Sequence, residues 1–219
     1  MTVIISAHIA DIMTSYIHQR EDWPRFRWDA GALVEPLGTV RHRQGRLLGR
    51  MQGLGFRLQE EAVLHTLTED VQKSSEIEGE KLERDQVRSS LARRLGMDVG
   101  GLVAADRNVE GIVEMMMDAT ANYRKPLDAE RLFAWHSALF PTGRSGMSVI
   151  KVGRWRKEAS GPMQVVFGPV GKERVHYEAP PAARVAKEMR KFLTWFAKPG
   201  DTEPLLVAGL AHLWFVTIH

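Results

Sequence analysis

The chain has 219 residues, 44% of them hydrophobic, with a formal net charge of +3 and no cysteine. This length and composition suffice for one large or two small domains with a buried core, and they exclude a disordered chain. The lack of cysteine excludes disulfides and zinc–cysteine sites and fits a reducing cytoplasm, where we expect the protein to reside. Helical periodicity dominates the sequence, and it predicts a mainly α fold with one β-hairpin.

The N-terminal segment carries aromatic residues on both sides of a proline. Residues 1–10 lack the basic region that begins a secretory signal. In residues 15–30, Trp23, Phe26 and Trp28 surround Pro24. Because proline favours an extended backbone before it, we expect an extended segment whose aromatic rings pack against the body of the protein.

The first helix is predicted over residues 32–54 and ends at two glycines. Its apolar face consists of Leu37, Val40, Leu47, Leu48 and Met51. Its opposite, wet face consists of Arg41, Arg43, Arg46 and Arg50. Together with Arg93 and Arg94, these arginines leave open a nucleic-acid binder, although most such faces are only solvated and we expect no nucleic-acid partner.

The remaining elements follow from periodicity and from turn residues. We predict helices over residues 57–77, 80–95, 106–122, 128–140 and 182–196, and a final helix from Pro204. The apolar run 204–218 is short for a membrane span and contains His212, so a buried helix is the better interpretation. Two short strands, 163–167 and 174–177, are predicted on either side of a glycine-containing turn.

A serine, a glutamate and a glycine near residue 78 are candidate functional residues. Ser74 and Glu78 are four residues apart, which places a hydroxyl and a carboxylate on one face of a helix, and Gly79 can end that helix. The same residues also fit a capping box, in which Ser75 and Glu78 would only begin a helix. The spacing alone favours this structural interpretation.

A histidine at the end of the last apolar helix is the second candidate. A lone histidine on such a helix is usually a core residue. His212 and His219 do not form a metal site together, because seven helical residues separate them by roughly 10.5 Å. We therefore predict no metal site in this chain.

Several segments resemble the Fic (filamentation induced by cAMP) family of protein adenylyltransferases. Ser74-Ser-Glu-Ile-Glu-Gly79 is similar to the inhibitory motif of this family, and Ala211-His-Leu-Trp-Phe-Val-Thr-Ile-His219 is similar to the approach to its catalytic loop. Residues 16–97 resemble a helical region that precedes some bacterial Fic domains, through Tyr16-Ile-His-Gln, Asp22-Trp-Pro-Arg-Phe, Gln44-Gly-Arg-Leu-Leu-Gly49 and Ser90-Leu-Ala-Arg-Arg-Leu-Gly96. The resemblance implies a Fic-like helical bundle, with an N-terminal region in residues 1–100 and part of a Fic domain in residues 101–219.

The resemblance also implies roles for individual residues. Ser74, Glu78 and Gly79 would belong to the inhibitory helix, whose glutamate pairs with the last arginine of the catalytic loop and blocks the site of the ATP γ-phosphate. His219 would be the general base. The hairpin would be the flap that docks the target by strand addition, with Met163, Gln164, Val165, Val166 and Phe167 as the docking strand. Gly153-Arg-Trp-Arg156 and Tyr177-Glu-Ala-Pro-Pro181 resemble the surroundings of the flap, where we expect them to act in packing.

The function implied is a self-inhibited transfer of AMP from ATP, with Mg²⁺, to a Ser, Thr or Tyr hydroxyl of a target protein. We expect the chain to stop at the first residue of the catalytic loop and to be inactive by itself, because the phosphate cradle and the metal ligand lie outside it. The alternative is a non-enzymatic helical module, such as an antitoxin-like inhibitor of a nucleotidyltransferase partner. A homodimer remains open, and no membrane association is expected.

Overall fold

The computed structural model describes residues 15–77, 79–98, 100–145, 148–158, 161–169 and 171–218. The chain divides into two compact units. One combines residues up to Asp29 with those from Trp155 onward, and the other spans Ala30–Arg154. Helices on both sides of residue 100 pack against each other within the second unit.

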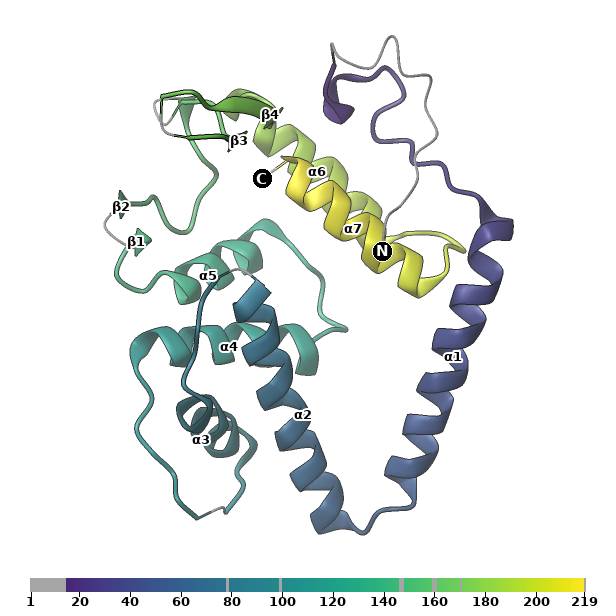
Figure 1. The fold of residues 1–219 in the computed structure, drawn as a ribbon, viewed down its shortest axis with the longest axis vertical. Coiled ribbons are helices and arrows are strands. Elements are labelled where there is room, and N and C mark those ends of the chain that lie inside the picture. Colours follow the sequence, from purple (N-terminus) through teal and green to yellow (C-terminus); the bar gives the residue numbers. More distant parts are fainter. Residues whose placement is uncertain are drawn as a thin grey trace. The chain divides into compact units, whose positions relative to one another are not determined.

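The fold is mainly α, as the periodicity predicts (Figure 1). The helices are α1 (Ala30–Gln52), α2 (Phe56–Ile77), α3 (Arg84–Leu95), α4 (Arg107–Ala121), α5 (Ala129–Leu139), α6 (Ala182–Ala197) and α7 (Pro204–Ile218), with a short 3₁₀ turn η1 (Ile17–Gln19). The helix expected from residue 80 begins at Arg84 instead. The preceding residues connect α2 to α3, and the carbonyl of Leu82 in this connection accepts a hydrogen bond from Gln72 Nε2 at 3.2 Å.

The strands form two antiparallel pairs. β3 (Gln164–Phe167) pairs with β4 (Arg174–Glu178), which confirms the predicted hairpin. Val165 lies opposite Tyr177 and Val166 opposite Val175, with an irregularity between the two pairs. A second pair, β1 (Arg144–Ser145) with β2 (Ser148–Val149), was not expected, since two-residue strands leave no periodic signal.

The core of the second unit lies among α2, α3 and α4. Its buried residues are Leu64, Val71, Val87, Leu91, Ala92, Val109, Ile112 and Val113. Helix α5 packs closely on α4 at Gly111, where an added Cβ would lie 1.8 Å from the carbonyl oxygen of Ala138. Only glycine permits this approach, because a methyl group at that distance would overlap the backbone.

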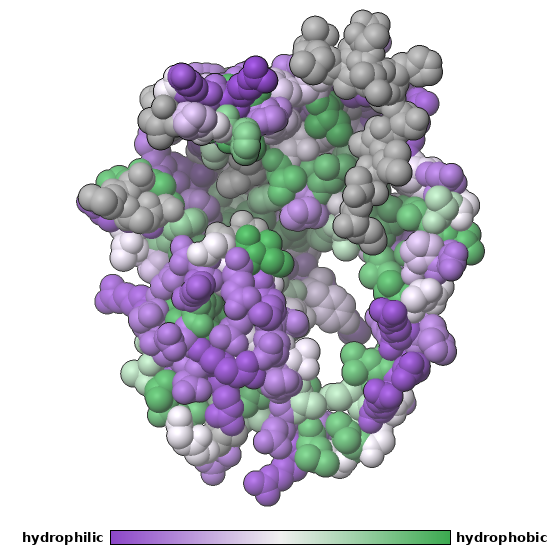
Figure 2. Space-filling view, viewed as in Figure 1, coloured by the Kyte–Doolittle hydropathy of each residue, from purple (hydrophilic) through white to green (hydrophobic). Residues whose placement is uncertain are grey.

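Helix α1 has no buried residue, although it belongs to the second unit. Its expected apolar face is exposed at Val40, Leu47 and Leu48. Figure 2 shows hydrophobic and hydrophilic side chains interspersed along this helix. The sequence therefore predicted the helix and its amphipathic pattern, but among the described residues three side chains of the apolar face stay exposed and the other two are only partly buried.

An aromatic cluster holds α6, α7 and the N-terminal segment of the first unit together. The ring of Trp214 on α7 contacts Trp23 and Phe26 of the N-terminal segment and Phe192 of α6, with ring centroids 5.7–5.9 Å apart. Two of the three aromatic residues expected to pack against the body therefore do so. Trp28 does not, because 46% of its surface is exposed.

A buried glutamate fastens the same segment to α6. Glu188 is 2% exposed and accepts hydrogen bonds from Trp23 Nε1 at 3.2 Å, Lys191 Nζ at 3.2 Å and Arg184 Nη2 at 3.3 Å. Burial raises the pKa of Glu188, but these hydrogen bonds outweigh burial and lower it below its usual value. Its charge is thus compensated from two elements, as a buried carboxylate requires.

No helix in the described ranges is both long and apolar enough to cross a membrane.

Asp118 ties the end of α4 to α5. Its carboxylate accepts hydrogen bonds from Arg131 Nε at 2.7 Å, Trp135 Nε1 at 2.8 Å and Asn122 Nδ2 at 2.7 Å. The hydrogen bond from Arg131 is the main cause that lowers the pKa of Asp118 to about 2. A carboxylate whose pKa is lower in the folded than in the unfolded protein stabilises the fold at pH values above its unfolded-state pKa. This stability is lost as the pH falls through the folded-state pKa.

We therefore expect Asp118→Asn to lower the free energy of unfolding at neutral pH by about 1 to 2 kcal/mol, because one charge-assisted set of hydrogen bonds is weakened. The difference from the wild type should shrink as the pH falls from about 4 towards 2, which urea denaturation at a series of pH values measures. Asp70→Asn, on the exposed face of α2, is the control. An equal loss in both variants would contradict this role for Asp118.

Candidate functional site

The serine and glycine of the candidate motif lie at the C-terminal end of α2. Gly79 has a φ of +85°, and its N–H donates to the carbonyl of Glu76 at 3.0 Å. The N–H of Glu80 donates to the carbonyl of Ser75 at 2.9 Å. This pair of hydrogen bonds is the Schellman arrangement that ends a helix, and its left-handed position favours glycine. Gly79 is therefore a helix-ending residue, as one of its sequence interpretations predicted.

The capping-box interpretation is wrong, because these serines lie in the last turns of a helix and not at its start. The side chain of Ser75 is buried, whereas Ser74 is exposed. Glu78 lies outside the described residues. The pattern misled because a serine three residues before a glutamate occurs in the interior of many helices as well as at their beginnings.

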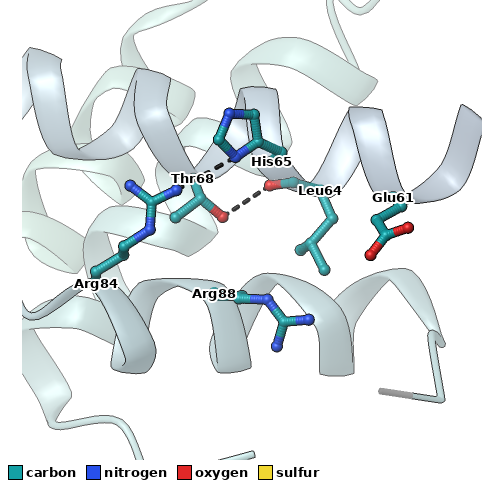
Figure 3. Close-up of a pocket in the computed structure, with 6 residues that line it drawn as sticks. All are labelled: Glu61, Leu64, His65, Thr68, Arg84 and Arg88. Carbon is teal, nitrogen blue, oxygen red and sulfur yellow. Dashed lines mark hydrogen bonds between the residues drawn. The ribbon is translucent and has the colours of Figure 1, made fainter. Parts of the chain in front are cut away.

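A cleft of about 360 Å³ lies between α2 and α3 (Figure 3). Arg84 spans it by pairing with Glu69 and by donating from Nη2 to His65 Nδ1 at 3.2 Å. Arg88 also lines the cleft. None of the predicted site residues lines it, so this cleft is not the site that the sequence predicted. Its charged side chains join the start of α3 to the middle of α2.

The hairpin β3–β4 exposes the five residues expected to dock a target. Met163 precedes β3, and all four residues of β3 are exposed, from 50% at Val166 to 74% at Phe167. β3 pairs only with β4 in this two-stranded sheet, so its other edge presents backbone N–H and C=O groups without a strand partner among the described elements. An exposed apolar edge of this kind is suited to strand addition.

Two side chains outside α7 hold the carbonyl groups at its C-terminal end. The phenol of Tyr177, on β4, donates to the carbonyl of Thr217 at 2.6 Å. Arg156 Nη2 donates to the carbonyl of Pro180 and to that of Ile218 at 3.4 Å. The last carbonyls of a helix have no partner within the helix, and its C-terminal end attracts positive charge. Thr217 and Ile218 directly precede His219, which lies outside the described residues.

Burial governs the ionisation of both side chains. It is the main cause that raises the pKa of Tyr177 to about 12, so the phenol keeps its proton and remains a donor at neutral pH. Burial also lowers the pKa of Arg156. The Nε atom of Arg156 is buried and has no hydrogen-bond acceptor in the part of the chain that the structure describes.

The N-terminal segment reaches the same place through His18. This side chain is 3% exposed, and its Nε2 lies 2.7 Å from the carbonyl oxygen of Glu178 at the end of β4. The carbonyl can only accept, so Nε2 carries the proton. Burial is the main cause that lowers the pKa of His18. The rings of Tyr16 and His18 both pack against Tyr177, with centroids 5.3 and 5.9 Å away.

The arginines that left nucleic-acid binding open are partly neutralised. Arg93 and Arg94 each donate to the carboxylate of Glu110 at 3.0 Å. Two of the six arginines in that set therefore form ion pairs within the chain, which weakens a continuous basic surface. Among the described residues, no three histidine, aspartate or glutamate side chains gather in a way that could hold a metal ion.

The structure thus gathers the hairpin β3–β4, Tyr177, Arg156 and the end of α7 in one unit, and places Ser74 and Gly79 in the other. The sequence patterns indicated Arg156 and Tyr177 only as parts of two packing segments and predicted no particular contact for either. Their pairing with α7 could not be read from the sequence, because 62 and 40 residues separate the hydrogen-bonded partners.

Three comparisons place the chain among known proteins. Residues 16–97 match a family described as "Domain of unknown function (DUF4172)". No curated protein matches the chain. Among the solved structures that match is a Fic family protein from Desulfovibrio desulfuricans G20, with 27% sequence identity, a TM-score of 0.48 and coverage of 90% of this chain. The chain spans 54% of the length of that solved chain.

Proposed function

We propose that this chain forms the regulatory and target-docking part of a self-inhibited, Fic-type protein adenylyltransferase. The observation that carries the proposal is the occurrence, in one chain and in this order, of the Ser74–Gly79 motif, an exposed hairpin and a histidine directly after the apolar helix α7, of which only Trp214, Thr217 and Ile218 are buried. The family match over residues 16–97 covers the region that we expect to precede the Fic domain. The hydrogen bonds at Gly79 end α2 directly after the motif, which is consistent with an inhibitory helix that stops there.

The proposed reaction transfers AMP from ATP to a protein hydroxyl. The imidazole of His219 takes the proton of the target hydroxyl while the hydroxyl oxygen forms a bond to the α-phosphorus of ATP. The bond between the α-phosphorus and the oxygen of the β-phosphate breaks, so that pyrophosphate leaves. Mg²⁺ would neutralise the phosphate charge in this chemistry. Among the described residues, no three histidine, aspartate or glutamate side chains lie close enough together to hold that ion.

Self-inhibition in this proposal comes from the carboxylate of Glu78. A carboxylate matches the two parallel donors of an arginine, so it can occupy a guanidinium that would otherwise bind the γ-phosphate of ATP. Ser74 lies near the end of α2 and is exposed, so its hydroxyl is accessible. The last turn of α2 needs a defined end to present such a group, and the hydrogen bonds at Gly79 and Glu80 supply it.

Target docking in this proposal uses the free edge of β3. We expect Val165→Lys, at a position 59% exposed, to raise the KM for the target protein roughly threefold, because a charged side chain on this exposed strand weakens pairing with an added target strand. Steady-state AMP transfer at varied target concentration measures this. Val149→Lys, on the exposed strand β2, is the matched control. A larger effect of the control than of Val165→Lys would argue against docking at β3.

One experiment tests the proposed reaction itself. The full-length protein, with whatever sequence its gene encodes after His219, is incubated with Mg²⁺ and ATP labelled at the α-phosphate or at the γ-phosphate. We expect label on protein from the α position only, and none with residues 1–219 alone. Label from the γ position would indicate a kinase instead. No label on any protein, together with co-purification of a separate nucleotidyltransferase, would favour the antitoxin-like alternative.

A further inference from the structure

We propose that Tyr177 and Arg156 are positioning residues that link the flap to the start of the catalytic loop. This inference rests on the function proposed above, because it assigns the residue after Ile218 a part in catalysis. It adds to that function a physical connection between the surface that docks the target and the segment that carries the base.

The connection through Tyr177 begins on the flap. Tyr177 belongs to β4 and lies opposite Val165 of the docking strand. Its phenol donates to the carbonyl of Thr217, two residues before His219. The ring of Tyr177 is held by Tyr16 and His18, and His18 is itself bonded to the carbonyl of Glu178. A shift of β4 along or across the hairpin therefore acts on the last turn of α7.

The connection through Arg156 fixes the neighbouring carbonyl. Arg156 bridges the carbonyl of Pro180, which follows β4, and that of Ile218. Together the two side chains donate to the consecutive carbonyls of Thr217 and Ile218. The buried Nε of Arg156 still lacks an acceptor among the described residues. An unpaired buried donor is unfavourable, so Arg156 Nε retains the capacity to donate one more hydrogen bond.

The arrangement matters because a general base works only within hydrogen-bond reach of the proton that it removes. A small displacement of the backbone before His219 changes that reach. Addition of a target strand to β3 would fix the position of the hairpin, and the hydrogen bond from Tyr177 would carry this constraint to the end of α7. The flap in this proposal therefore does more than hold the target: it also constrains the backbone of the last turn of α7.

The test compares two tyrosine variants in a full-length protein that also carries Glu78→Gly, so that self-inhibition is absent. Tyr177→Phe keeps the ring contacts and removes only the hydroxyl donor. We expect kcat for AMP transfer to fall about tenfold, with the KM for ATP and for the target changed less than about twofold. Tyr123→Phe, at a position 66% exposed after α4, is the control and should match the parent.

A second readout does not depend on activity. The imidazole resonances of His219 and His212 in the nuclear magnetic resonance spectrum should respond differently: Tyr177→Phe should shift the His219 signal and leave that of His212, earlier on α7, in place. Arg156→Lys, which keeps the charge but loses the planar fork, should shift the His219 signal as well. Circular dichroism confirms that each variant is folded.

The outcomes separate this inference from the proposed function. An unchanged kcat and an unshifted His219 resonance in Tyr177→Phe would overturn the inference, while AMP transfer by the parent would leave the proposed function standing. Absence of AMP transfer in the parent would overturn the proposed function, and the inference with it. A rise in KM alone would assign Tyr177 to docking and would contradict a positioning role.

Discussion

Replacement of Glu78 by glycine is expected to raise AMP transfer by the full-length protein about tenfold or more. The proposed inhibitory pair is a charge-assisted contact between this carboxylate and an arginine that should bind the γ-phosphate, and loss of such a contact typically changes an equilibrium by a factor of ten to a hundred. The measurement is the rate at which α-labelled ATP modifies the protein itself, with Mg²⁺ present and no added target.

The control for this prediction is Glu80→Gly, which changes an exposed glutamate two residues away. It should leave the rate unchanged, although glycine also loosens the backbone there. Glu78→Gln removes the charge but keeps most of the bulk, and it should raise the rate less than Glu78→Gly does. Equal rates for the wild type and both Glu78 variants would remove this residue from an inhibitory role.

Replacement of His219 by alanine in the full-length Glu78→Gly protein is expected to lower kcat for AMP transfer by about 10² to 10⁴, the usual contribution of a positioned general base. Binding of ATP should change little, because the imidazole acts on the target hydroxyl and not on the nucleotide. Single-turnover transfer of label measures the first quantity, and equilibrium titration with ATP measures the second.

The matched control is His212→Ala on the same helix, where the side chain is exposed. It should retain the activity of the parent. Loss of activity in both variants would indicate a general disturbance of α7 and would leave no special role for His219. Full activity of His219→Ala would show that another group accepts the proton, and the proposed mechanism would then be wrong.

Periodicity and turn chemistry predicted most of the helices, because local patterns report which side of a segment is apolar and where its backbone can end. Pro204 is the first residue of α7, as expected for a residue whose missing N–H costs nothing there, and Glu203 accepts from Leu205 N and Leu206 N at 2.6 and 3.1 Å. The start of α3 was less predictable, since the preceding residues serve as a connection packed through Leu82.

The candidate site was predictable only in part. Short motifs indicated Ser74, Gly79 and the strand 163–167, and the structure describes these residues at a helix end and on an exposed hairpin edge. Glu78 and His219 remain predictions. The sequence also allowed a helix start at Ser75, because a capping box and the end of a helix share residue types, and only the hydrogen bonds at Glu80 and Gly79 distinguish them.

By itself, the sequence determined the mainly α class, the positions of most helices and the hairpin, because these depend on interactions between residues close together in the chain. Only the tertiary structure decided that Ala30–Arg154 forms one compact unit, that Val40, Leu47 and Leu48 of α1 stay exposed among the described residues, and that Arg156 and Tyr177 hold the end of α7. Each of these depends on contacts between residues distant in sequence, and no local pattern records which distant partner a side chain will meet.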